Sequence, residues 1–422
     1  MLDYDRKWAD YARWTPPLQP PQIDFPFAPP GRYQLPSGLT SNEVNPLSRN
    51  GKVGFHSHAL LSAGVIAQGQ MHRLSQPMRN AVSERDRART RIMGDSGGFQ
   101  VLTMNLAIND IARDHQLRWS ERYCDGALPL EVPSAAAHTP GNRYFGNFDL
   151  ALHDSEESHQ FFEDHYKGDT GMMRLAVMQG HTRQEVQRWY GVMKRFHWGN
   201  VARGGAMRFS FTHEVRFFRQ MYSDGYLENV QWVHYLGTGD PGVGLLLTAL
   251  RRALSRKLGR NVLVTYDAVT PHLYAYADQK AIVGVNWSGR GPTLLGVPLG
   301  KVGRPTDAEA RAPLPGSAVG CLDLTLADLR PRPQPNANGW DEPGRILLSS
   351  HNLDAMANAI ILCNQLADLN SGLSSPIPHA ILQARQVIES MFDDPNIERE
   401  LRHKSRQLNL FAKLRPEQGE LL

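Results

Sequence analysis

Residues 91–101 read RIMGDSGGFQV. Arg91-Ile92-Met93 is typical of the end of a buried strand. Gly97 and Gly98, which lack a Cβ, allow the backbone to turn sharply and to approach a ligand closely. An acid between a strand and a Gly-Gly turn is a common position for a catalytic carboxylate, so Asp95 is a candidate. The same residues also fit an ordinary strand-to-loop turn with a capping Asp, so the interpretation depends on the surrounding chain.

The chain around this stretch alternates short apolar runs with longer amphipathic runs. The candidate strands are ALLSAGVI, RIMGD, GALPLEVP, RLAVMQG, VARGGAM, VHYLGTG and VLVTYDAV. Strands that alternate with helices indicate βα units and a parallel sheet, and this number of strands favours a (β/α)8 TIM barrel over a doubly wound sheet. Chemistry in such a barrel lies where strands end. The residues at those predicted ends are Asp95, Glu131, Gln179, Gly205, Gly237 and Asp267.

The predicted barrel covers residues 51–385 and has terminal extensions and an insertion. Residues 1–50 are Pro-rich and predict an extended arm laid over a domain, because proline fixes φ and has no amide proton. Residues from about 300 to 352 are rich in Pro and Gly and predict an inserted subdomain. The apolar run that begins at Ile346 predicts the final strand and helix, with Asn352 or Asp354 near the helix N-cap. Residues 386–422 predict a basic helical tail.

Composition limits the class of protein. The chain has 422 residues, of which 41% are hydrophobic and 21% charged, which allows a large core and excludes global disorder. No uninterrupted apolar run approaches 18 residues and the N-terminus does not resemble a signal peptide, so we expect a cytoplasmic protein with no membrane partner. Three cysteines are too few for a disulfide framework. A net charge of +4 leaves any nucleic-acid affinity to local basic patches.

Six motifs together resemble the tRNA-guanine transglycosylase superfamily, a (β/α)8-barrel group that exchanges guanine for a 7-deazaguanine. DSGGFQV is similar to the signature of that family, and ALPLEVPS to the strand that carries its base-recognising acid. LAVMQG, ARGGAM and HYLGTGDP resemble the next three loops. VTYDAVTP resembles the segment with the nucleophile, and LLSSHNL resembles LLTYHNL. The order of the motifs along residues 90–370 is more specific than any one of them.

The resemblance implies a double displacement at C1′ run by two carboxylates, as in retaining glycosidases. Asp267 is then the nucleophile and Asp95 the general acid/base, with no cofactor needed for the chemistry. Glu131 stands where the family has an Asp for the donor edge of the base, and Gln179 and the Gly205 N–H match groups that bind O6. The full set implied for base binding is Ser96, Phe99, Gln100, Glu131, Gln179, Gly204, Gly205 and Leu236.

Two departures from the family bear on metal and substrate. The register of its structural zinc site gives Cys321, Asp323, Leu326 and His351, and leucine cannot be a ligand. A structural zinc is therefore doubtful, although Cys321, Asp323 and His351 remain, and Asp323 or Cys363 could belong to a rebuilt site. The Arg that follows Pro-Thr in the family is also missing after Pro271.

In these departures the chain resembles the DNA branch of the superfamily, which inserts 7-cyano-7-deazaguanine into DNA. We therefore expect DNA, a 7-deazaguanine base and companion DNA-modification proteins as partners, with tRNA as the alternative polymer. A duplex target base would have to be flipped out of the stack. The candidate phosphate-binding residues come from two clusters, Arg79–Arg91 and Arg251–Arg260, and include Arg87, Arg89, Arg251 and Arg252. Solvated helix faces are the ordinary explanation of such clusters.

Two further classes compete with a transglycosylase. His56-x-His58 near the first strand has the spacing of metal-dependent amidohydrolase barrels. Those enzymes need histidines where Gln179 and Gly205 stand, although Asp267 could serve as the last ligand. A non-catalytic subunit of the superfamily would be expected to lack one of the two catalytic acids, and this chain has both.

Overall fold

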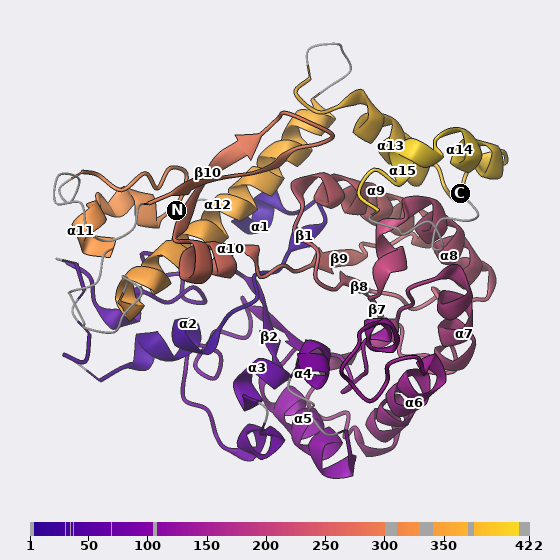
Figure 1. The fold of residues 1–422 in the computed structure, drawn as a ribbon, viewed down its shortest axis with the longest axis horizontal. Coiled ribbons are helices and arrows are strands. Elements are labelled where there is room, and N and C mark those ends of the chain that lie inside the picture. The colour runs from indigo at the N-terminus through magenta and orange to yellow at the C-terminus, as the bar shows by residue number, and fades with distance from the viewer. Residues whose placement is uncertain are drawn as a thin grey trace.

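The computed structural model describes residues 4–29, 31–33, 35–36, 38–68, 70–103, 108–299, 310–329, 341–369 and 375–412. It is a mixed α/β structure with two parallel sheets and many helices (Figure 1). The strands are β1 (Arg13–Trp14), β2 (His58–Ser62), β3 (Arg91–Asp95), β4 (Gly126–Ala127), β5 (Met173–Arg174), β6 (Ala176–Met178), β7 (Val201–Arg203), β8 (Trp232–Tyr235), β9 (Leu263–Tyr266), β10 (Lys280–Asn286) and β11 (Thr293–Pro298).

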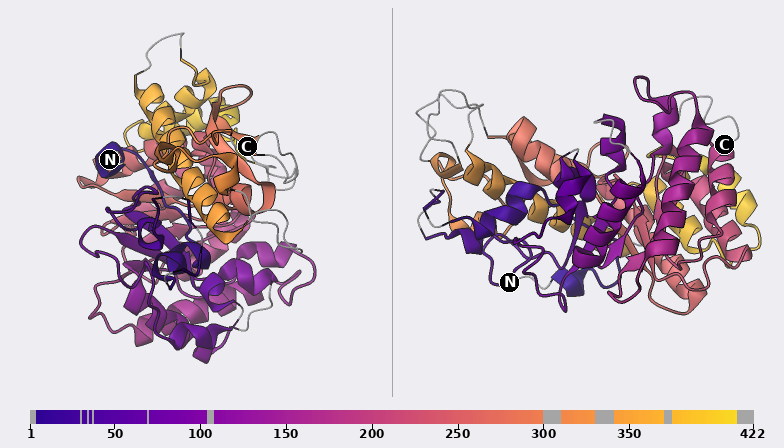
Figure 2. Two further views of the ribbon diagram at one scale, coloured as in Figure 1. Left: turned by 90° about the vertical axis from the view of Figure 1, so that its left-hand side faces the viewer. Right: turned by 90° about the horizontal axis from the view of Figure 1, so that it is seen from below.

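The helices between consecutive strands cover the outer side of the sheets. The α-helices are α1 (Tyr4–Lys7), α2 (Pro20–Asp24), α3 (Ala63–Ala67), α4 (Gly98–Thr103), α5 (Asp110–Tyr123), α6 (Phe148–His165), α7 (Arg183–Met193), α8 (Phe211–Ser223), α9 (Pro241–Leu258), α10 (Thr270–Leu273), α11 (Leu326–Leu329), α12 (Glu342–Asp368), α13 (His379–Glu389), α14 (Ile397–His403) and α15 (Ser405–Leu408). Helices α5 to α9 form an arc outside the strands (Figure 1). Figure 2 shows the C-terminal helices, in orange and yellow, on the side of the molecule opposite α5 and α6.

The parallel α/β arrangement expected from the alternating runs is confirmed. One sheet has the order β1-β9-β8-β7-β6 and the other has the order β2-β3-β4-β5, with parallel pairing throughout. The two sheets contact each other along the chain between β5 and β6. There Leu175 donates its N–H to Ala127 of the second sheet, at 3.0 Å, and Ala176 donates to Asn200, which precedes β7, also at 3.0 Å.

A second contact between the sheets involves the N-terminal arm. Pro17 and Leu60 form an isolated parallel bridge, and the Leu18 N–H donates to the Leu60 carbonyl at 2.9 Å. Arg13 and Trp14 in the same segment pair with Thr265 and Tyr266 of β9. The arm therefore contributes a strand to the sheet, and its Pro-rich stretch also holds the short helix α2.

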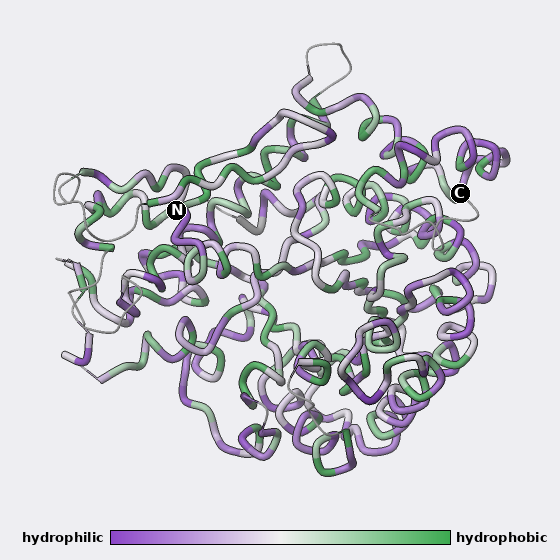
Figure 3. The backbone as a smooth tube through the Cα atoms, viewed as in Figure 1, coloured by the Kyte–Doolittle hydropathy of each residue, from purple (hydrophilic) through white to green (hydrophobic). Residues whose placement is uncertain are grey.

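Alternate residues of the strands pack between the two sheets. The interior cluster consists of Leu60, Met93, Leu128, Leu175, Val177, Ala202 and Trp232, which are all at most 4% exposed. The Trp232 ring reaches β4, since a Cβ on Gly126 would lie 2.5 Å from Trp232 Cζ3. The inner faces of the two sheets therefore oppose each other. Hydrophobic residues concentrate on these strands and along α12, whereas α14 is mainly hydrophilic (Figure 3).

The final strand predicted at Ile346 is wrong, because these residues lie in α12. This helix begins after Asp341, whose side chain accepts the Gly344 N–H at 2.7 Å, so neither Asn352 nor Asp354 is near the N-cap. Its 20 buried residues lie all around the helix, which is why its sequence resembles a buried strand. By length and composition α12 could cross a membrane, but 89% of its most apolar window is buried within the described structure, as in a core helix.

A hairpin precedes the region predicted as an inserted subdomain. Strands β10 and β11 are antiparallel. Residues 300–309 and 330–340 of this region lie outside the described residues, as do residues 413–422 of the predicted tail. Residues 310–329 pack against α12 and the arm in a second core cluster that includes Val53, Leu314, Val319 and Ile346.

Candidate active site

The parallel strands bring three carboxylates to the same edge of the two sheets. Asp95 is the last residue of β3, Asp267 directly follows β9, and Glu131 follows β4 by four residues. Because side chains alternate along a strand, Asp95 shares a face with the interior residue Met93. Asp267 likewise shares a face with Leu263, which packs against the same cluster. The carboxyl ends of the strands therefore present these acids above the interior cluster.

Asp95 lies beside β2 and at the start of a tight loop. It pairs in register with Ser62 of β2, and its Oδ2 accepts the Gly97 N–H at 3.2 Å. Burial raises the pKa of Asp95, and the negative charge of Asp267 raises it further, while Ser62, the Gly97 N–H and His234 act in the opposite direction. Asp267 is thus close enough for its charge to act on Asp95, and Asp95 is biased toward holding a proton.

Asp267 is held by the loop that follows β8. Its Oδ1 accepts the Gly237 N–H at 2.8 Å, and its backbone carbonyl accepts the Thr238 N–H at 2.6 Å. The residue is 8% exposed, so the carboxylate is nearly enclosed but reachable from the strand ends. These contacts fix Asp267 to the loop that follows β8.

Glu131 and Gln179 form one hydrogen-bonded unit. Gln179 Nε2 donates to Glu131 Oε2 at 2.7 Å and to the Val132 carbonyl at 2.8 Å, and its Oε1 accepts the Ser134 N–H at 2.9 Å. The two backbone groups determine which way the amide points. The amide of Gln179 is therefore fully used within the protein, which differs from its expected role as a reader of O6.

Glu131 is 3% exposed and faces the first loop. Burial raises the pKa of Glu131 to about 8, and the charge of Asp95 adds to the rise, while Gln179 and Ser96 oppose it. A Cβ on Gly98 would lie 2.5 Å from Glu131 Oε1. The longer side chain, compared with the Asp of the family, thus extends to the backbone of the DSGG loop.

The glycines of the loops after β6 and β7 permit a close backbone contact. Gly205 has a φ of +74°, and a Cβ there would lie 2.3 Å from the Gly180 carbonyl oxygen. A Cβ on Gly204 would lie 3.4 Å from Gln179 Oε1 and 3.5 Å from Leu236 Cδ1. Gly204, Gly205, Gln179 and Leu236 are therefore brought together, as the sequence predicts.

The first loop places its side chains in different directions. Phe99 in α4 is 68% exposed, so its ring is available to a ligand. Ser96 is fully buried and accepts the Gly98 N–H at 3.2 Å. Gln100 Oε1 lies 2.7 Å from the position of a Cβ on Gly64, so this side chain packs against α3. Gln100 therefore supports the loop, in contrast to its predicted contact with the base.

Two residues of the site were not predicted from the sequence. Arg208 donates to the carbonyls of Gly205 and Gly237, the latter at 3.1 Å, and ties two loops together. Burial lowers its pKa to about 10, against the opposing charge of Asp267, so it remains a cation at neutral pH. His234, in β8, has its Nε2 3.4 Å from Asp267 Oδ1. His234 is two residues from Trp232 and from Leu236, so the alternation of side chains along a strand could have placed it on the same face as these residues. Nothing in the sequence marked Arg208.

The predicted phosphate-binding arginines are not at this edge. Arg87 donates to the Arg122 carbonyl and Arg89 pairs with Asp86, both before Arg91 begins β3. Asp95 ends β3 four residues later, which corresponds to about 13 Å of extended strand. The cluster therefore lies at the opposite end of β3 from Asp95, and phosphate binding by Arg87 and Arg89 stays a prediction.

Arg251 and Arg252 have structural partners. Arg251 is 7% exposed and donates to the carbonyls of Ala9, Tyr11 and Val262, the last of which precedes the first residue of β9. Arg252 pairs with Asp368 at 2.6 Å. These contacts connect α9 to the arm and to α12 at the amino end of β9, so they do not provide a phosphate-binding surface beside Asp267.

The remaining residues of the zinc register do not fit a zinc ion. His351 is fully buried, with Nε2 2.8 Å from the Ile282 carbonyl and Nδ1 2.7 Å from Ser317 Oγ, so both ring nitrogens are used. Cys321 Sγ points to the Ser317 carbonyl at 3.6 Å, and Asp323 pairs with Arg311. Among the residues that the structure describes, no group of three or more His, Cys, Asp or Glu side chains could hold a metal ion.

The HNL motif instead connects α12 to the segment that follows Asp267. Asn352 Nδ2 donates to the carbonyls of Pro271 and Lys280, at 3.2 and 2.9 Å, and its Oδ1 accepts the Ile282 N–H at 2.8 Å. His351 holds the same strand through Ile282. These contacts fix the segment that follows Asp267.

The histidines of the amidohydrolase alternative are at the wrong end of β2. His58 begins this strand, whereas Ser62, which pairs with Asp95, ends it. His58 Nδ1 lies 2.5 Å from Arg13 Nη1, and burial and the charge of Arg13 hold its pKa well below the usual range. A metal held there would be remote from the strand-end carboxylates.

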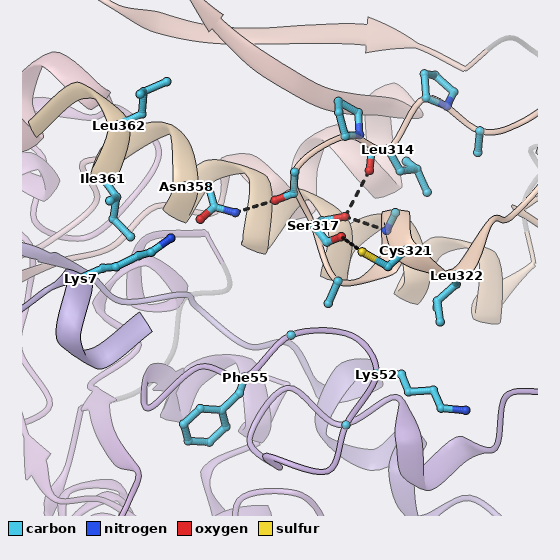
Figure 4. A pocket seen from close by; sticks show the side chains of 18 of the residues that line it. Lys7, Lys52, Phe55, Leu314, Ser317, Cys321, Leu322, Asn358, Ile361 and Leu362 are labelled. Carbon is cyan, nitrogen blue, oxygen red and sulfur yellow. Dashed lines mark hydrogen bonds between the residues drawn. The ribbon is translucent and has the colours of Figure 1, made fainter. Parts of the chain in front are cut away.

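A large cavity lies elsewhere (Figure 4). It has a volume of about 1250 Å³ and lies between residues 51–55, residues 311–322 and α12. None of the described residues that line it is an Asp or Glu, and none is a predicted catalytic or base-binding residue. Its size alone therefore does not make it the catalytic site.

No protein-family model matches the chain, and a comparison with curated proteins finds no match. Conclusions about function therefore depend on the motifs and the geometry described above.

Proposed function

We propose that this chain is a base-exchange transglycosylase that replaces guanine with 7-cyano-7-deazaguanine in DNA through a covalent glycosyl-Asp267 intermediate. The observation that carries the proposal is the placement of Asp95 and Asp267 at the same edge of the two sheets, with Asp95 biased toward the protonated form by burial and by Asp267. One protonated and one ionised carboxyl are what a double displacement at C1′ requires. The order of the motifs around both acids also supports a transglycosylase that works by double displacement.

We also propose that the two parallel sheets form a single closed (β/α)8 barrel. The bridge between Pro17 and Leu60 connects one pair of edges, and the hydrogen bonds of Leu175 and Ala176 connect the other. The interior cluster, with residues from both sheets, supports the closure. In this arrangement β1 is the eighth strand, and the candidate acids lie at the catalytic face of the barrel.

In the first step, a carboxylate oxygen of Asp267 forms a bond to C1′ while the bond from C1′ to guanine N9 breaks. The departing base takes the proton of Asp95. In the second step, Asp95 accepts the N9 proton of the incoming base, which attacks C1′ and releases Asp267. Each step inverts C1′, so the configuration is retained overall. Both carboxyl groups return to their starting forms, and no cofactor is needed.

Glu131 is the proposed reader of the donor edge of the base. Guanine and 7-cyano-7-deazaguanine both present N–H donors there, and a carboxylate accepts them with charge-assisted hydrogen bonds. Gln179 holds the carboxyl in place, Phe99 is the exposed ring that would stack on the base, and the Gly205 backbone and Leu236 complete the pocket. Because the pKa of Glu131 is about 8 before binding, base binding is expected to release a proton.

DNA is proposed over tRNA because the chain lacks the Arg after Pro271 and lacks the zinc ligands that accompany it in the tRNA enzymes. The two basic clusters no longer support this choice, given their placement. We further propose a cytoplasmic protein that acts with companion DNA-modification proteins. The test is incorporation of labelled 7-cyano-7-deazaguanine into duplex DNA and into bulk tRNA under matched conditions. Label in DNA supports the proposal, and label in tRNA alone refutes the choice of polymer.

A further inference from the structure

His234 has a buried nitrogen that faces the nucleophile. The side chain is fully buried, and its Nε2 makes no hydrogen bond within the protein by ordinary criteria. The nearest ion-pair contact of Nε2 is Asp267 Oδ1 at 3.4 Å. Buried polar atoms almost always have a partner, so an exception beside a candidate catalytic carboxylate calls for an explanation. Contacts of catalytic groups are often long before substrate binds and shorten in the complex.

The partners of the other ring nitrogen determine which tautomer is present. His234 Nδ1 lies 2.7 Å from Thr265 Oγ1, and Trp232 Nε1 lies 2.7 Å from the same hydroxyl oxygen. An indole N–H can only donate, so Thr265 Oγ1 accepts from Trp232. If His234 also donated to it, the hydroxyl proton of the fully buried Thr265 would have no acceptor among these groups. Thr265 therefore donates to Nδ1, and the ring proton is on Nε2.

We propose that His234 is a positioning residue for Asp267: Trp232 and Thr265 fix its Nε2–H tautomer, and this N–H holds Oδ1 of the carboxylate. The chemical consequence rests on the proposed function, whereas the tautomer does not. Gly237 N–H and His234 then both act on Oδ1, and Oδ2 is the oxygen directed at C1′. Formation of the glycosyl ester requires this fixed orientation.

The first experiment measures the tautomer directly by ¹⁵N–¹H NMR of the histidine rings in the full chain. Comparison with His234→Gln assigns the His234 signal. We expect Nε2 protonated and Nδ1 unprotonated in the wild type and in Thr265→Ser, which keeps the hydroxyl. In Thr265→Val, which keeps the shape but lacks the hydroxyl, Nε2 should keep its proton because it faces Asp267, and the Nδ1 signal should shift because this nitrogen loses its hydrogen bond. A wild-type ring with the proton on Nδ1 would overturn the proposal, whatever the enzyme does.

The second experiment measures the rate of covalent adduct formation with DNA. His234→Leu should lower this rate by roughly 10- to 100-fold, the range for loss of a hydrogen bond to a charged group, with little change in DNA affinity. His234→Gln, whose amide can place a donor near Nε2, should recover part of the rate. An unchanged rate in His234→Leu would overturn the proposal. If the wild type forms no adduct, the proposed function fails, and the NMR result still decides the tautomer.

If His234→Leu does not fold, Thr265→Val provides a second test, since it removes the hydrogen bond that fixes the His234 ring without removing the ring. A slower adduct rate in Thr265→Val with a normal rate in Thr265→Ser supports the role of His234. Equal rates in the two variants, with folding verified by circular dichroism, contradict it.

Discussion

Glu131→Gln should remove a large pH dependence from the stability of this protein. Glu131 is almost fully buried, and its pKa is about 8 in the folded chain against 4.5 as the ordinary value. The folded state therefore binds a proton more tightly than the unfolded state does. Between these two pKa values the folded chain retains the proton and the unfolded chain loses it, so the free energy of unfolding falls as the pH rises.

The magnitude follows from the two pKa values. One pKa unit corresponds to about 1.4 kcal/mol, so the wild type should lose on the order of 4 kcal/mol of stability through this one group between pH 4.5 and pH 8. The Gln side chain has the same shape, does not titrate and can still accept from Gln179. The variant should thus equal the wild type within about 1 kcal/mol near pH 5 and exceed it by several kcal/mol at pH 8.

The assay is urea denaturation followed by fluorescence at a series of pH values from 4.5 to 9. The difference between variant and wild type cancels titrations that the two proteins share. The exposed Glu84 provides the matched control, since Glu84→Gln should give a difference that does not change with pH. Parallel curves for wild type and Glu131→Gln, or a variant that is less stable at pH 8, would refute the reasoning about the burial of Glu131.

Three further predictions concern the loops, the helix α12 and the metal. Gly205→Ala should cost roughly 3 kcal/mol in urea denaturation, because of its φ and the Gly180 contact, whereas Gly171→Ala, with φ +68° and open space, should cost about 1 kcal/mol. Asn352→Leu removes three buried hydrogen bonds and should cost about 3 kcal/mol, with faster hydrogen exchange at Ile282. Elemental analysis should find less than one equivalent of zinc, and one tightly held zinc per chain would contradict this.

The strands were predictable from the sequence because their signals are local. Runs such as RIMGD and VLVTYDAV are apolar, short and followed by a glycine or an acid, and each contains a strand in the structure. Strand β1 was not predictable as such, since Arg13 and Trp14 form only two residues of strand in a Pro-rich segment. The run at Ile346 was misassigned because a helix that is buried on all sides has no amphipathic period to distinguish it from a buried strand.

The site was predictable only in part. The positions of Asp95, Glu131 and Asp267 follow from strand ends, which periodicity locates. The role of Gln179 does not, because it depends on contacts with Val132 and Ser134, which are about 45 positions away in the sequence. The sequence also does not tell which end of a strand a basic cluster will reach in the folded chain, and the arginines before β3 lie at the end of that strand opposite Asp95.

The most direct test of the central claim is mass spectrometry of the trapped enzyme. The wild-type chain would be incubated with duplex DNA without an incoming base, quenched in denaturant, and digested to locate the attachment. The account predicts a glycosyl ester on Asp267, absent in Asp267→Asn although that variant still binds DNA. It also predicts that adding 7-cyano-7-deazaguanine before the quench removes the adduct. An adduct on another residue, or base exchange at a normal rate by Asp267→Asn, would contradict the account.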